Sequence, residues 1–250
     1  VLFPSICVSG SKNGLLLWFQ VVLPTLFPFL VLSRLFITLG FANYFGNTTS
    51  CIVIGLLSGY PVGASTIAQM TKSNDISKNR GQFLLGFCNN ASPMFIISYI
   101  GLQTMNMTSA AYFFPIIILF SCLIAALFIY RPNREKKSKT KKHNKISILE
   151  IIDLSIFESF RTLVLVGGYI ILFCTLISFL NHITFLSSTT RAILSSLMEI
   201  TSGAHMFTYI CMNANIKTAL ILSLCTLGGF SSIAQTQSVL KDSGLSTTSY

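Results

Sequence analysis

Residues 81–130 read GQFLLGFCNNASPMFIISYIGLQTMNMTSAAYFFPIIILFSCLIAALFIY, a run of fifty positions without an Asp, Glu, Lys or Arg. Ionisable side chains are costly in hydrocarbon, so an uncharged stretch of this length is typical of membrane spans. The segments 13–33, 35–71, 162–190 and 218–240 also lack these four residue types. Only 10% of the chain is charged, against about 25% in soluble domains, and its mean hydropathy is +0.71. The sequence therefore predicts an all-α, polytopic integral membrane protein.

The segment that follows this run is strongly basic. Residues 131–145 hold eight Lys or Arg and one Glu, so the segment alone contributes +7 to a net charge of +10. Basic loops favour the cytoplasmic side and attract anionic lipid headgroups, so we expect a cytoplasmic loop in contact with lipid. A nucleic-acid site is not expected, because no basic and aromatic surface accompanies the charge.

The basic loop divides the chain into a first membrane repeat (1–130) and a second (146–250). We expect the second repeat to be truncated at its C-terminus, and the first residue, Val1, suggests a segment of a longer protein. Residues 146–160 have apolar positions at helical spacing with acidic residues opposite them. They predict an amphipathic helix at the interface or, alternatively, a helix packed on neighbouring spans.

Hydrophobic segments of two kinds are present. Residues 110–130 and 161–180 are plain spans, and Gly167-Gly168 in the second would let another backbone approach closely. The other segments carry Pro, Gly or polar residues in their middle: 23–30, 55–70, 82–97, 197–207 and 227–240. Interrupted backbone at membrane depth occurs where it is buried in protein or lines a polar cavity. These five segments therefore indicate more than a passive anchor.

The breaks recur in order in the two halves. A Leu-Ser-Gly break at 57–59 corresponds to Thr-Ser-Gly at 201–203, and the polar break ending at Ser92 corresponds to the one ending at Ser232. Ser58 and Ser202 are 144 positions apart, and Ser92 and Ser232 are 140 apart. Matching interrupted segments point to a transporter built from repeats, with its binding site at their interface. Whether the repeats are inverted stays open.

Polar residues at these breaks are the candidate substrate-binding groups. They are Ser58, Gly59, Tyr60, Gly63, Asn89, Asn90, Ser92, Thr201, Ser202, Ser231, Ser232 and Gln235. Half-helix N-termini formed at such breaks present positive dipole ends, which suit a carboxylate or a phosphate. The alternative role for these side chains is hydrogen bonding between helices.

Glu199 lies in a mostly apolar stretch, three residues before Ser202. A carboxylate within the membrane is a candidate ligand for a coupling ion, H⁺ or Na⁺. The alternative is a shallow position where the carboxylate is solvated or paired with Arg191. Arg34 is expected to snorkel or to pack near an interface.

Enzymatic signatures are absent from the sequence. It has no phosphate loop, no nucleophile elbow and no metal-ligand spacing, and its seven scattered cysteines form no C-x-x-C pair. We therefore expect neither catalysis nor a bound metal or organic cofactor.

The motifs SGYPVGA (58–64) and FCNNASPMFI (87–96), together with LVLVGGYIILF, LMEITSGAHMF and LGGFSSIAQTQSVL, resemble the sporulation integral membrane protein YlbJ family. Members carry the nucleoside-recognition (Gate) domain, whose motif here would cover 55–97. The resemblance implies a fold like that of concentrative nucleoside transporters. It also implies delivery of dipicolinate, a planar dianion, during sporulation.

Three functions follow as hypotheses. The first is a transporter of a small anionic or polar solute, with the polar groups at 58–63, 89–92, 199–203 and 231–235 converging on one cavity. The second is a membrane scaffold of the sporulation machinery, in which these groups are satisfied pairwise. The third is a nucleoside permease. Coupling ion, direction and oligomeric state are left open.

Overall fold

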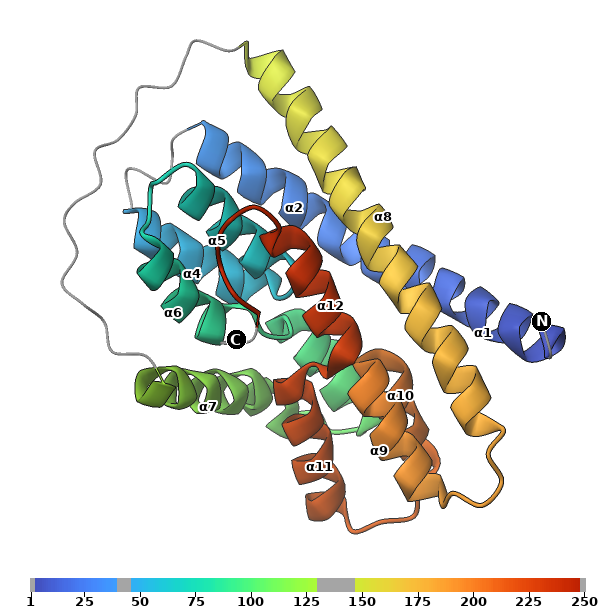
Figure 1. Cartoon of the computed structure of the whole chain (residues 1–250). Coiled ribbons are helices and arrows are strands. Elements are labelled where there is room, and N and C mark those ends of the chain that lie inside the picture. Colours follow the sequence, from blue (N-terminus) through green and yellow to red (C-terminus); the bar gives the residue numbers. More distant parts are fainter. Residues whose placement is uncertain (1–2, 40–45, 130–146, 248–250) are drawn as a thin grey trace. The chain divides into compact units, whose positions relative to one another are not determined.

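The computed structural model describes residues 3–39, 46–129 and 147–247, and every regular element in these ranges is helical (Figure 1). The predicted all-α class is confirmed, while the basic loop 131–145 lies outside the described residues. The α-helices are α1 (Pro4–Leu17), α2 (Leu23–Thr38), α4 (Asn47–Ser58), α5 (Val62–Lys72), α6 (Lys78–Cys88), α7 (Phe114–Ile129), α8 (Ile148–Asn181), α9 (Ser188–Met198), α10 (Ile200–Met206), α11 (Ala214–Leu227) and α12 (Gly229–Leu240). The segments η1 (Trp18–Val22) and η2 (Phe95–Thr104) are π-helical, and η3 (Ala110–Phe113) and η4 (Phe207–Tyr209) are 3₁₀ turns.

Two helical stretches among the described residues are long and apolar enough to cross a membrane. Ile148–Asn181 has a mean hydropathy of 2.5, and Ala214–Leu240, which contains α11 and α12, has 1.5. Pro4–Val22 and Leu26–Thr38 would add a third span if this pair, bent by 52°, crosses as one. These helices support a membrane protein, and the number of crossings stays a prediction.

Helix α8 is longer than the sequence pattern predicts. The amphipathic stretch 148–160 and the plain span 161–180 form one uninterrupted helix of 34 residues. The reason is that residues 148–166 contain neither Gly nor Pro, so nothing stops the backbone hydrogen bonds from continuing. Residues 148–160 are therefore the first turns of α8 and not a separate helix.

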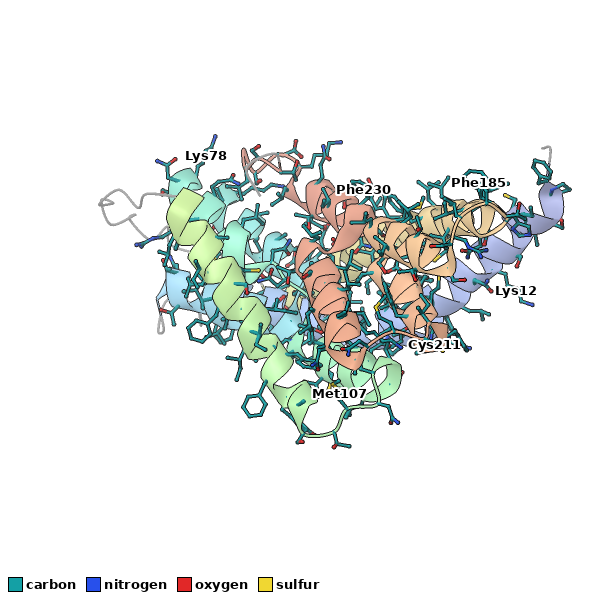
Figure 2. All side chains as sticks on the ribbon, turned by 90° about the horizontal axis from the view of Figure 1, so that it is seen from below. Lys12, Lys78, Met107, Phe185, Cys211 and Phe230 are labelled. Atoms are coloured by element: carbon teal, nitrogen blue, oxygen red, sulfur yellow. The ribbon has the colours of Figure 1, made fainter. Side chains whose placement is uncertain are left out.

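Helix α7 is apolar on both its faces. Phe114, Ile118 and Cys122, four residues apart, are buried, whereas Ile117 and Phe120 are 51% and 59% exposed. The side chains of Phe185 and Phe230 are also exposed (Figure 2). Exposed apolar surface of this kind suits contact with lipid tails.

The chain forms two compact units, each of which combines segments from distant parts of the sequence. Unit 1 comprises Val1–Leu23, Pro93–Ile118 and Leu165–Gln235, and unit 2 comprises Pro24–Ser92, Leu119–Val164 and Thr236–Tyr250. Helices α7, α8 and α12 contribute residues to both units. The division at 131–145 into two repeats stays a prediction.

Unit 2 is built around α5. Residues 62–68 of this helix are all buried, as are Met70 and Thr71. On one side, Val62 packs with the fully buried Leu30 of α2 and Leu163 of α8. A helix enclosed on all sides has to be composed of small or apolar residues, and the sequence VGASTIA meets this requirement.

Unit 1 is held together by the packing of α1 and η1 against the second half of α8. Val166, Ile170 and Cys174 form the buried cluster, and Trp18 packs against it. A Cβ at Gly167 would lie 2.7 Å from the Trp18 ring, whereas nothing lies within 4 Å of the same position at Gly168. The close approach expected at Gly167-Gly168 therefore occurs at Gly167, toward an aromatic ring and not toward a backbone.

Candidate functional site

In unit 2, α4 and α5 form an antiparallel helical hairpin (Figure 1). Cys51 Sγ near the start of α4 donates to Met70 Sδ near the end of α5 over 3.1 Å. At the closed end, a Cβ on Gly63 would lie 3.2 Å from Gly55 Cα, so these glycines allow the two helices to touch. Gly59 ends α4 with φ +74°, a conformation that suits glycine.

The tip of this hairpin contacts a second break in the chain, between α6 and η2. Tyr60 N–H donates to the carbonyl oxygen of Asn90 over 2.8 Å. A Cβ on Gly59 would lie 2.5 Å from Ser92 N. The predicted groups Ser58, Gly59, Tyr60, Gly63, Asn89, Asn90 and Ser92 are therefore brought together within unit 2.

Asn89 joins three helices of unit 2. Its side chain is fully buried, with Oδ1 accepting from Ala64 N–H (3.1 Å) and Nδ2 donating to Thr236 Oγ1 (2.9 Å). Asn90 is partly exposed; its Nδ2 donates to Phe87 O (2.6 Å) and its Oδ1 accepts from Cys122 Sγ (3.2 Å). Both amides thus make contacts between or within helices, and their role in binding a solute stays a prediction.

Unit 1 contains a second hairpin, formed by α9 and α10. Glu199 alone separates the two helices, with extended backbone angles of φ −148° and ψ 115°. Helix α10 folds back on α9 so closely that a Cβ at Gly203 would lie 2.1 Å from Ser196 N. The break expected at Thr201-Ser202-Gly203 thus lies at Glu199, because the Glu199 side chain caps α10 and residues 201–203 continue as helix.

The Glu199 carboxylate is 5% exposed and accepts two backbone hydrogen bonds. Thr201 N–H donates to Oε1 over 3.0 Å, and Ser202 N–H donates to Oε2 over 2.7 Å. The positive end of α10 therefore compensates part of the buried negative charge. Arg191, the alternative partner, donates from Nη1 to Asn181 O (3.1 Å).

The tip of this second hairpin contacts the break between α11 and α12. Gly228 and Gly229 have φ of +73° and +75°. A Cβ on Gly229 would lie 2.9 Å from Ser196 O and 3.1 Å from Leu197 O. A hairpin tip against a helix break is therefore found once in each unit.

This arrangement revises the spacing of the two halves. The residues that end the first helix of each hairpin are Gly59 and Glu199, 140 positions apart (199 − 59). Gly63 and Gly203, the close-contact glycines, are also 140 apart (203 − 63), as are Ser92 and Ser232. This single spacing of 140 positions replaces the pairing of Ser58 with Ser202, which are 144 positions apart.

The other predicted residues of the second half also lie in unit 1. Ser231, Ser232 and Gln235 are buried on α12, where Gln235 Nε2 donates to Ser231 Oγ (3.0 Å) and Ser232 Oγ donates to Gly229 O (2.9 Å). Ser202 Oγ lies 3.4 Å from Cys174 Sγ. Convergence of these groups with those of unit 2 on one cavity stays a prediction, as does the proximity of 55–70 to 197–207.

Sequence reasoning missed three residues beside the hairpins. Tyr99 OH donates to Thr201 O over 3.0 Å. Thr66 Oγ1 on α5 and Ser195 Oγ on α9 are buried without a hydrogen-bond partner among the described residues. The sequence gives no sign of either situation, because tertiary packing decides whether a hydroxyl is buried and whether it finds a partner.

These features define the class as a helical integral membrane protein with discontinuous helices. The chain is 23% identical to the sporulation integral membrane protein YlbJ of Bacillus subtilis (strain 168), over 97% of this chain and 72% of YlbJ. This likeness supports the assignment to the YlbJ family that the motifs at 58–64 and 87–96 predicted. No family model matches the chain, and no solved structure matches it.

Proposed function

We propose that the protein is a multi-pass membrane transporter or permease of a small anionic or polar solute. The observation that carries the proposal is the hairpin tip seated against a helix break, found in each unit. Such interruptions leave backbone hydrogen-bonding groups at the ends of half-helices, where transporters bind their substrates and coupling ions.

The solute that we propose is dipicolinate, moved during sporulation. The name of the relative, a sporulation integral membrane protein, supports the setting, and the family resemblance supports the solute. Amide dipoles at broken helices are chemically compatible with a planar dicarboxylate. Residues 131–145 would then face the cytoplasm and the anionic lipids of that leaflet.

Two observations favour the alternative of a non-transporting scaffold. The Asn89 amide bonds to neighbouring helices, and Gln235 bonds to Ser231 on its own helix. Groups satisfied in this way need no solute. A nucleoside permease is the third candidate, and it rests on the family's domain name alone.

Uptake by the purified protein in liposomes tests these functions. We expect accumulation of labelled dipicolinate above that of protein-free liposomes, and no accumulation of labelled uridine or adenosine. Uptake of nucleosides alone would favour the permease, and uptake of neither solute would favour the scaffold.

Asn90→Leu tests whether the break in unit 2 takes part in uptake. We expect the variant to insert at normal level and to accumulate less dipicolinate, because it loses a partly exposed amide beside the hairpin tip. Exposed Asn13 on α1 provides the control variant, Asn13→Leu. Normal uptake by Asn90→Leu would make Asn90 a packing residue.

A further inference from the structure

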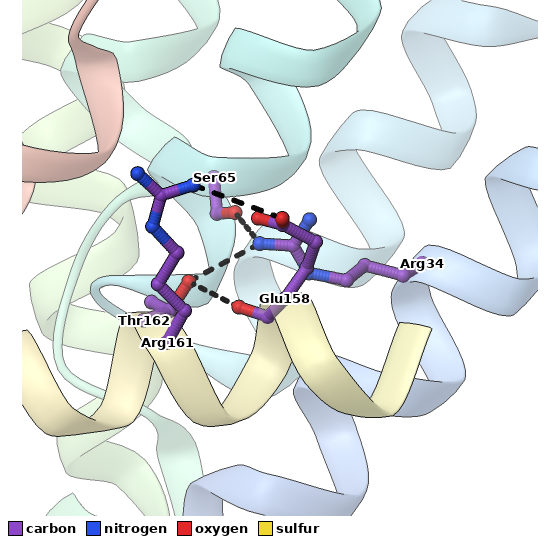
Figure 3. Close-up of polar contacts among 5 residues, drawn as sticks. All are labelled: Arg34, Ser65, Glu158, Arg161 and Thr162. Carbon is purple, nitrogen blue, oxygen red and sulfur yellow. Dashed lines mark hydrogen bonds and ion pairs between the residues drawn. The ribbon is translucent and has the colours of Figure 1, made fainter. Parts of the chain in front are cut away.

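Arg34 on α2 is the single Asp, Glu, Lys or Arg between Asn13 and Thr71 in the sequence. Its hydrogen-bond partners, Ser65 and Thr162, belong to unit 2 as Arg34 does. It is partly buried, and its guanidinium is directed at neighbouring helices (Figure 3). A guanidinium in an apolar segment requires compensation of its charge and of its donors.

The hydrogen bonds of Arg34 go to neutral acceptors. Nη2 donates to Ser65 Oγ on α5 (3.3 Å) and to Thr162 Oγ1 on α8 (3.2 Å), as Figure 3 shows. Thr162 Oγ1 itself donates to the carbonyl oxygen of Glu158 (3.0 Å), so it offers a lone pair to the guanidinium. Arg34 Nε is buried and has no acceptor among the described residues. The buried Nε–H of Arg34 is therefore unmatched, and the two acceptors bring no negative charge.

The carboxylate of Glu158, which lies near Arg34, forms an ion pair with Arg161. Glu158 Oε1 lies 3.8 Å from Arg161 Nη1, and these side chains are 41% and 70% exposed. Glu158 acts on Arg34 through space, and it would also repel an incoming anion. Two arginines and one glutamate leave this cluster with a formal charge of +1 (2 − 1). The cluster formed by Arg34, Ser65, Glu158, Arg161 and Thr162 therefore retains a positive charge.

Apolar groups around the guanidinium increase the strength of its electrostatic interactions. Leu30, one turn before Arg34 on α2, is fully buried together with Val62 and Leu163. The rings of Phe27 and Phe160 pack with their centroids 4.6 Å apart. Electrostatic interactions are larger beside such apolar groups than in water.

From these contacts we propose that Arg34, Ser65 and Thr162 form a subsite for a carboxylate of the transported solute. The inference rests on the proposed transport of an anion and adds the group that would recognise its charge. Guanidinium binds planar carboxylates by paired hydrogen bonds, and Arg34 Nε–H would be the first of these donors. Ser65 belongs to the α4–α5 hairpin, so a bound carboxylate would contact the hairpin directly.

Binding to the purified protein in detergent tests the subsite. The two probes are dipicolinate and its neutral diamide, pyridine-2,6-dicarboxamide, which has a similar shape. We expect Arg34→Gln to weaken dipicolinate binding by at least about tenfold, the size of a lost charged hydrogen bond, and to leave the diamide unaffected. Arg34→Lys keeps the positive charge but not the planar, paired donors of the guanidinium. Its affinity for dipicolinate should therefore lie between those of the wild type and Arg34→Gln. Arg80→Gln, the same substitution at an exposed position of α6 outside the cluster, should change dipicolinate binding by less than about twofold.

The ratio of the affinities for dipicolinate and for the diamide distinguishes a lost subsite from a misfolded variant. A misfolded variant loses both ligands, in which case Arg34→Lys decides, whereas loss of the subsite lowers the preference for the dianion alone. Unchanged preference in Arg34→Gln, or equal losses in Arg34→Gln and Arg80→Gln, would overturn the inference and leave Arg34 as a tie between α2, α5 and α8. If the wild-type protein transports dipicolinate and Arg34→Gln keeps the preference, only the subsite fails. If binding depends on Arg34 but liposomes take up no dipicolinate, only the proposed transport fails.

Discussion

Asn89 shows how one side chain can link two other helices at a helix break. Its amide accepts from the N–H of Ala64 in the first turn of α5 and donates to Thr236 on α12, and no part of it is exposed. Because the N-terminal amides of a helix lack intrahelical partners, Asn89 Oδ1 satisfies one that would otherwise be buried unpaired.

We expect Asn89→Ala to lower the stability of the protein by about 1–3 kcal/mol, because Ala64 N–H and Thr236 OH would lose their partner. Thermal unfolding in detergent measures this loss. Exposed Asn13 provides the control, and Asn13→Ala should unfold within the error of the wild type. Equal stability of the two variants would mean that water replaces the Asn89 amide.

Glu199 presents a second case at the residue scale. In Glu199→Gln only one oxygen remains to accept an N–H, and the new NH₂ group would face the N–H of Ser202 or Thr201. We expect a loss of about 1–2 kcal/mol in stability and an uptake that no longer follows an imposed pH or Na⁺ gradient. Glu150→Gln, on an exposed position of α8, should retain both properties. Gradient-dependent uptake by Glu199→Gln would leave the carboxylate with its capping role only.

At the scale of the element, Gly167 and Gly168 on α8 give a matched pair. Gly167→Ala brings a methyl group to 2.7 Å from the Trp18 ring, whereas Gly168→Ala meets open space. We expect Gly167→Ala to destabilise the packing of η1 on α8 by about 1–3 kcal/mol. Gly168→Ala should stabilise the protein by up to about 1 kcal/mol, the helix propensity gained over glycine. Thermal unfolding of both variants checks the pair, and a similar effect of the two would contradict the packing described for Trp18.

Gly and Pro act locally, so the sequence allowed the breaks within 55–70 and 82–97 to be predicted. The interruption expected within 23–30 is only a bend of 52° between Pro4–Val22 and Leu26–Thr38, and α2 continues as a helix through Pro28. The breaks after Ser58 and before Pro93 follow from residues that cannot continue a helix. The break at Glu199 was misplaced by two residues, since Glu is a good helix former and only the packing of α10 on α9 turns it into a cap.

Partners distant in sequence could not be predicted. Nothing in the pattern around Arg34 indicates Ser65 or Thr162, which are 31 and 128 positions away. The same holds for Asn89 and Thr236, 147 positions apart. Spacing rules describe neighbours on one helix, and these contacts depend on how α2, α5, α8 and α12 pack.

At the scale of the whole molecule, the predicted topology can be tested by labelling. A cysteine introduced as Ser138→Cys lies in 131–145, and we expect it to react with an impermeant maleimide only after the membrane is opened. Among the described residues, Cys7 is partly buried and Cys211 is exposed, whereas the other cysteines are buried. Cys7 and Cys211 would therefore first be replaced by serine. The control is the parent protein with only these replacements. Reaction of the introduced thiol in intact cells would mean that 131–145 faces away from the cytoplasm.

The length of α8 has a consequence for the bilayer in which the protein works. Its 34 residues extend over roughly 50 Å, whereas a hydrocarbon layer is about 30 Å thick. The charge-free part, 162–181, matches that thickness with 20 residues (181 − 162 + 1), and Thr162 would lie at its boundary. A thicker bilayer would draw Thr162 and its partner Arg34 into hydrocarbon, or tilt the helix. Activity should therefore depend on lipid chain length.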